Sequence, residues 1–114
     1  MKLFINDTEV PVTWEVNESV RALRELAGED GLKISMSMYG GFEQVGSIGK
    51  SLPRNDQQTK TDSGDIVLYS GIQIVIFYGS NSWAYTRLGH VDLSRKEMTE
   101  LLGNEDVSIR ITEG

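Results

Sequence analysis

Two aromatic residues within a polar stretch are the side chains of this sequence best suited to recognising a ligand. Trp83 and Tyr85 follow Gly79-Ser80-Asn81-Ser82, which contains no large apolar side chain. Aromatic rings in such surroundings bury a large area on contact and can hydrogen-bond at their edge, as in peptide recognition. Two roles for Trp83 stay open: a ligand-facing ring in a loop, or a plug that closes one end of the fold.

Other patterns that could carry chemistry give weaker interpretations. Gly49-Lys50-Ser51 ends like a phosphate-binding loop, but Gln44 stands where the pattern requires glycine. His90 is the only histidine and lies in a predicted strand, which favours a structural role over a catalytic or metal-binding one. The chain has no cysteine, which excludes disulfides, thiol catalysis and zinc–thiolate sites. We therefore expect neither a cofactor nor a metal.

The net charge of the chain limits the kinds of partner that we expect. Its 114 residues include 11 basic and 17 acidic side chains, for a formal net charge of −6, and the basic residues are scattered. Such a chain repels phosphate groups at long range, so neither nucleic acid nor an anionic membrane is an expected partner. The length predicts one domain over residues 1–114, the short apolar run at the N-terminus is not expected to be a signal peptide, and no apolar stretch reaches roughly 20 residues. With no cysteine, it is predicted to be cytoplasmic.

Apolar patterns of strand length dominate the sequence. The predicted strands are Lys2–Ile5, Glu9–Val16, Leu32–Tyr39, Ile66–Tyr69, Ile74–Tyr78, Thr86–Val91 and Val107–Thr112, with Phe42–Val45 continuing the third. The runs at 66–69 and 74–78 are so close that they must pair as a hairpin, and neither alternates cleanly, so both of its faces should be covered. Residues 46–61 are predicted to be mostly loop.

Two helices complete the predicted fold. Asn17 caps the first, over 18–27, and Ser94 with Glu97 forms a capping box for the second, which ends at Gly103. About eight strands with two short helices predict a mainly β fold, a closed eight-stranded β-barrel with two short capping helices.

This order of elements resembles that of the cyclophilins over nearly the whole chain, and most closely that of small bacterial cyclophilin-like proteins. Three segments carry the resemblance in detail: Gly41–Gly46, Gln73–Ile76, and Trp83 with the following Arg87–Val91. The resemblance implies a cyclophilin-like barrel with a cleft that holds a proline-containing peptide.

The resemblance also implies which residues would form that cleft. Phe42 and Gln44 match the phenylalanine and the glutamine of the proline pocket. Gln73 and Val75 match a glutamine and an aromatic residue on a second strand, and Trp83 matches a loop tryptophan. The sequence departs from the cyclophilins because residues 36–41, directly before Phe42, contain no arginine and because valine replaces the aromatic residue at position 75.

Prolyl isomerisation sets physical requirements on such a cleft. The amide barrier of about 20 kcal/mol reflects resonance that is lost in the twisted state, so a pocket must hold the ring while a donor or cation stabilises the amide nitrogen. Arg87 is the candidate cation, and Gln44 or Gln73 is the candidate donor. Arg54 is a poorer candidate because it lies in the long loop.

We expect a binding domain that grips an extended or proline-containing peptide or protein segment between Phe42 and Trp83. Gln73, Val75 and Tyr85 would complete its binding surface. A weak peptidyl-prolyl cis–trans isomerase using the same cleft, with Arg87 as its cation, stays open as an alternative, and so does a small-molecule-binding barrel. The identity of the partner and the oligomeric state stay open as well.

Overall fold

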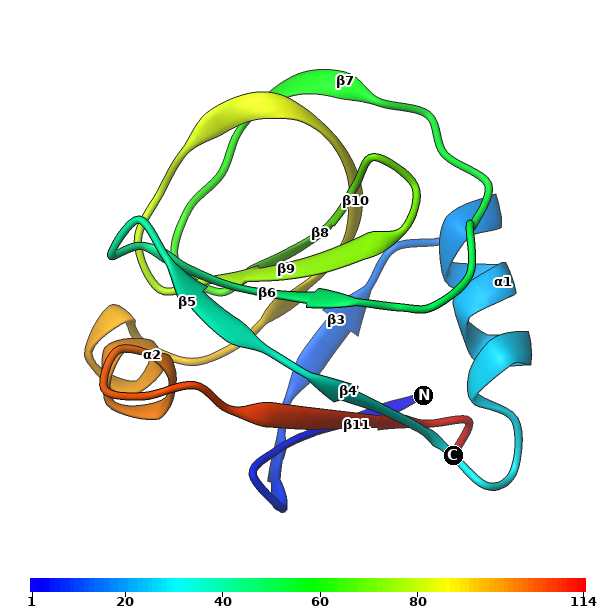
Figure 1. Cartoon of the computed structure of the whole chain (residues 1–114), viewed down its shortest axis with the longest axis horizontal. Coiled ribbons are helices and arrows are strands. Elements are labelled where there is room, and N and C mark those ends of the chain that lie inside the picture. Colours follow the sequence, from blue (N-terminus) through cyan, green and yellow to red (C-terminus); the bar gives the residue numbers. More distant parts are fainter.

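The computed structural model describes residues 1–114 as two antiparallel β-sheets with two helices at opposite sides of the molecule (Figure 1). The strands are β1 (Lys2–Ile5), β2 (Thr8–Val10), β3 (Val12–Trp14), β4 (Leu32–Ser35), β5 (Ser37–Tyr39), β6 (Glu43–Ser47), β7 (Gln57–Lys60), β8 (Asp65–Tyr69), β9 (Gln73–Phe77), β10 (Ser82–Val91) and β11 (Ser108–Thr112). The helices are α1 (Glu18–Ala27) and α2 (Arg95–Leu102). The mainly β class with two helices is therefore confirmed.

The prediction of a closed eight-stranded barrel is wrong. The strands form a 4-stranded sheet in the order β2-β1-β11-β4 and a 7-stranded sheet in the order β3-β10-β8-β9-β6-β5, with β7 added on β10. The reason lies at two corners where a predicted continuous strand passes from one sheet to the other. Pro11, which has no N–H to donate, separates β2 from β3. Met36 separates β4 from β5, and its N–H donates to the Val107 carbonyl at 2.8 Å instead.

Both predicted helices are confirmed with their capping residues. The Asn17 side chain accepts a hydrogen bond from the Val20 N–H, and Ser94 forms the complete capping box with Glu97. Each helix buries an apolar stripe against the core, Val20 and Leu23 among the residues of α1. Neither helix has the length and the apolar character that crossing a membrane requires.

The β8–β9 hairpin separates two apolar clusters. Ile66, Leu68, Ile74 and Ile76 belong to the main core of 22 buried residues. The alternate residues Val67, Val75 and Phe77 turn to the other face, where they form a second cluster with Tyr85 of β10. The prediction that both faces of this hairpin are covered is thus confirmed, and the outer cluster lies next to the candidate site.

Strand β10 is longer than its sequence predicts. It begins at Ser82 rather than Thr86, so Trp83 lies on a strand and not in a loop. Strand β7 pairs with this extra length, with Trp83 opposite Thr59, and so gives regular structure to part of the predicted loop at 46–61. Figure 1 shows β10 as a long curved strand with β7 beside its first half.

Candidate functional site

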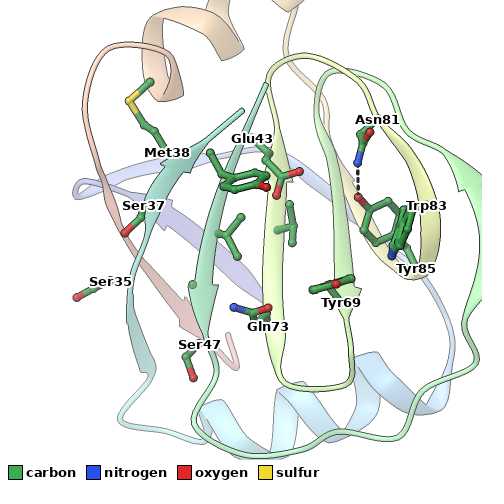
Figure 2. A pocket seen from close by; sticks show the side chains of 14 residues that line it. Ser35, Ser37, Met38, Glu43, Ser47, Tyr69, Gln73, Asn81, Trp83 and Tyr85 are labelled. Carbon is green, nitrogen blue, oxygen red and sulfur yellow. Dashed lines mark hydrogen bonds between the residues drawn. The ribbon is translucent and has the colours of Figure 1, made fainter. Parts of the chain in front are cut away.

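A cavity of about 620 Å³ lies on the outer face of the seven-stranded sheet, next to the second apolar cluster. Its lining comes from β4, β5, β6, β8, β9 and β10 and from Asn81, directly before β10. Figure 2 shows serine side chains along one side of the cavity and Trp83 with Tyr85 on the other. The mix of apolar, aromatic and a few polar side chains is typical of a ligand pocket.

Strand register explains the floor of the cavity. Val75 on β9 pairs with Val45 on one side and with Val67 on the other. Gln73, two residues earlier and therefore on the same face, lies between Ser47 and Tyr69. The floor is consequently apolar at its centre, with an amide and a hydroxyl toward one end.

Trp83 and Tyr85 on β10 form an aromatic wall of the cavity, in which the Tyr85 ring is fixed and the Trp83 ring is accessible. Tyr85 is buried at 4% exposure, lies edge-on to Tyr69 with ring centroids 6.1 Å apart, and accepts a hydrogen bond from the Asn81 amide at 2.9 Å. Burial raises the pKa of Tyr85. Trp83 is 56% exposed, so it neither closes the fold as a plug nor needs to move in order to contact a ligand.

Glu43 is the one charged side chain that lines the cavity. It is only 6% exposed, and the register places it between Tyr39 on β5 and Phe77 on β9. Burial raises the pKa of its carboxyl from 4.5 to about 7. A carboxylate among aromatic rings, with no cation beside it, is the strongest polar feature of this surface.

The structure brings together four of the residues that the sequence singled out. Gln73, Val75, Trp83 and Tyr85 all line the cavity. Phe42 lies beside it without lining it, because its ring is stacked on Phe77 at a centroid distance of 6.5 Å and an interplanar angle of 7°. Phe42 therefore supports the apolar end of the site from behind.

Gln44 does not reach the cavity. Its side chain turns to the opposite face of β6 and is completely buried, and its amide donates to the carbonyls of Leu102 and Glu105, each at 2.8 Å. The Gln44 carbonyl also accepts from the Val107 N–H at 3.4 Å. These contacts connect β6 to the end of α2 and to the segment after it, which is a structural role, and they leave no free donor for a ligand.

Arg87 also lies outside the cavity. Its guanidinium is 3.1 Å from Asp65, whose other carboxylate oxygen lies 2.8 Å from Nδ1 of His90. Arg54 is paired with Asp56 at 3.6 Å. Neither candidate for the missing cation therefore approaches the surface formed by Val75 and its neighbours.

Sequence reasoning missed Glu43, Tyr69 and Asn81, which all line the cavity. The signal for Glu43 was the alternation along β6, where residues 43, 45 and 47 share a face while Gln44 belongs to the other. The signal for Tyr69 was its place at the end of a strand, directly before the hairpin turn.

No group of three histidine, aspartate or glutamate side chains could hold a metal ion together. A family model described as Cyclophilin-like family matches residues 3–112 of the 114-residue chain. No curated protein and no solved structure matches the chain significantly.

Proposed function

The chain belongs to the cyclophilin-like family, and we propose that it is a binding domain whose cavity on the outer face of the seven-stranded sheet grips an extended or proline-containing peptide segment. The observation that carries this proposal is the combination of an apolar floor with an accessible tryptophan. Val45 and Val75 pair across two strands in the lining of the cavity, with Val67 opposite Val75 on the third strand, and Trp83 lines the same cavity with 56% of its surface exposed. A ligand that covers this ring buries a large area without first displacing a core residue.

The polar groups of the site favour a peptide as the occupant. An extended backbone presents donors and acceptors at regular intervals, and the cavity offers amide and hydroxyl partners at Gln73, Asn81 and Ser47. The volume of about 620 Å³ accommodates a few residues rather than a single small side chain.

The positions of the cations favour binding over isomerisation. Stabilising the twisted prolyl amide needs a donor or a cation at its nitrogen. Arg87 is held by Asp65, and the Gln44 amide is held by two carbonyls, so neither contributes to the cavity. The site then has a ring-binding surface without a cation, and the side chains of Gln73 and Asn81 are its only amide groups.

The proposal is tested by titrating ¹⁵N-labelled protein with a panel of acetylated, amidated Xaa-Pro pentapeptides and with matched peptides in which alanine replaces proline. We expect concentration-dependent shifts of the Trp83 indole signal and of the Gln73 side-chain amide. The Trp14 indole is an internal control, because its N–H donates to the Met1 carbonyl at 3.0 Å and its ring does not line the cavity. Exchange spectra on the same samples should show unchanged cis–trans rates.

Two variants sharpen the test. Trp83→Ala should weaken peptide binding by about tenfold or more, as for an aromatic anchor. Val16→Ala removes a fully exposed apolar side chain elsewhere and should leave affinity unchanged. Peptide-induced shifts confined to residues outside the cavity, or no shifts with any peptide, would overturn the proposal, and accelerated exchange would show an isomerase instead.

A further inference from the structure

The Glu43 carboxylate has no partner within the protein. None of the five ion pairs includes it, and burial is the only influence on its pKa, with no hydrogen bond contributing. Its side chain is nevertheless more than nine-tenths buried and lines the cavity. Figure 2 shows it near the middle of the lining, between the serine side and the aromatic side.

A buried carboxylate without a partner is costly, and glutamine would fill the same space without a charge. Burying an unpaired ionised group disfavours the folded state unless a cation or several donors compensate it. No lysine, arginine or histidine lines this cavity. A cationic group of a ligand would supply the compensation that the protein itself does not.

The surroundings of Glu43 select an organic cation rather than a metal ion. Calcium takes six to eight oxygen ligands and zinc takes nitrogen and sulfur ligands, whereas this cavity offers a single carboxylate. Aromatic rings attract cations over their faces, and Trp83 and Tyr69 line the same cavity. Between these groups, Val45 and Val75 provide an apolar floor for an aliphatic stem.

We infer that the peptide held in this cavity carries a basic side chain, with its cationic head at Glu43 and its methylene stem over Val45 and Val75. The inference rests on the proposed peptide-binding function and adds the charge of the ligand to it. The positive charge of such a ligand is complementary to the net charge of the chain, which is −6.

The test compares Ac-Ala-Ala-Lys-Ala-Ala-NH2 with the peptide in which norleucine replaces lysine, which keeps the aliphatic stem and removes the ammonium group. We expect calorimetry to show the lysine peptide binding about tenfold or more tightly than the norleucine peptide. Glu43→Gln should abolish this difference. Glu29→Gln removes one exposed carboxylate outside the cavity and should leave the difference intact, which separates a local ion pair from the general negative charge.

A third probe, n-butylammonium, separates the two proposals. Equal affinity for both peptides in the wild type would overturn the basic side chain and leave peptide binding standing. Failure of both peptides together with a Glu43-dependent shift of the Trp83 indole by n-butylammonium would overturn peptide binding and support cation recognition. No response to any of the three probes would overturn both. The Trp14 indole signal shows in each case that Glu43→Gln is folded.

Discussion

Two carboxylates of this protein are equally buried but differ in the partners that surround them. Asp65 and Glu43 are each 6% exposed. Asp65 receives the Arg87 guanidinium at 3.1 Å, the His90 imidazole at 2.8 Å and the Asp62 N–H at 2.8 Å. Glu43, in contrast, faces a cavity that contains no cation.

The surroundings of these two carboxylates distinguish polar residues that stabilise the fold from polar residues that are available to a ligand. Asp65, at the start of β8, binds two side chains of β10, so its charge is compensated within the sheet. Glu43 disfavours the folded state when it is ionised, and only a group from outside can compensate its charge. Gln44, the next residue, belongs with Asp65 because all its hydrogen-bonding groups are directed at the backbone.

The largest effect expected from this comparison concerns Gln44. Replacing the fully buried Gln44 by alanine leaves the carbonyls of Leu102 and Glu105 and the N–H of Val107 without their side-chain partner. We expect Gln44→Ala to lower the free energy of unfolding by about 4 kcal/mol, measured by urea denaturation. Gln73→Ala, at a half-buried site in the cavity, is the matched control and should cost less than about 1 kcal/mol. Equal losses in the two variants would break the distinction between structural and ligand-facing amides.

The second expected effect concerns Asp65. Asp65→Ala removes the partner of Arg87 and of His90, both of which remain 57% buried as side chains. We expect the free energy of unfolding to fall by about 3 kcal/mol, because a half-buried charge loses its partner. The exposed pair of Asp62 and Arg95 provides the control, since Asp62→Ala should cost about 1 kcal/mol or less. A small loss at Asp65 would show that its pairs are not structural.

The sequence predicted the helices and strands better than it predicted how the strands assemble into sheets. Both helices and their caps followed from local signals, and so did the hairpin with its two covered faces. The corners at Pro11 and Met36 could not be predicted as sheet boundaries, because which sheet a strand joins depends on partners distant in sequence. Strand β7 has the polar sequence Gln-Gln-Thr-Lys, so only its pairing with β10 reveals it.

The site was predicted in part for a similar reason. Trp83 and Tyr85 were identified by residue type, and Gln73 and Val75 by resemblance, and these four line one cavity. Glu43 and Gln44 are adjacent in sequence, which on a strand places their side chains on opposite faces. Motif matching could not decide between them, because their faces depend on the register of β6 with β5 and β9.

The third prediction uses the raised pKa of Glu43. Its carboxyl has a pKa of about 7 in the folded protein against 4.5 as the reference value, so between these values the folded state binds more protons than the unfolded state. The stability contributed by this group is therefore complete below pH 4.5 and is lost as the pH rises toward 7 and beyond. We expect Glu43→Gln to raise the free energy of unfolding by about 2 kcal/mol at pH 8, and the gain to vanish near pH 4.5.

Urea denaturation of wild type and Glu43→Gln across this pH range measures the effect, with Glu29→Gln as the exposed control. The other titratable side chains that line the cavity are phenols, so no second carboxylate or imidazole of the cavity contributes. A gain that is the same at every pH, or a loss at pH 8, would mean that a partner inside the protein already compensates Glu43.

The smallest expected effect on the free energy of unfolding concerns Trp83 in the aromatic wall. Trp83 is 56% exposed, so Trp83→Ala should change the free energy of unfolding by less than about 0.5 kcal/mol even though it removes the largest ring of the cavity. The same substitution at Trp14 should cost about 2 kcal/mol, because that ring packs against the main core and its N–H bonds to the Met1 carbonyl. Urea denaturation of the two variants side by side gives the answer. If Trp83→Ala costs as much as Trp14→Ala, the Trp83 ring supports β10 and β7 rather than waiting for a ligand, and Glu43 would then lose its aromatic partner in recognition.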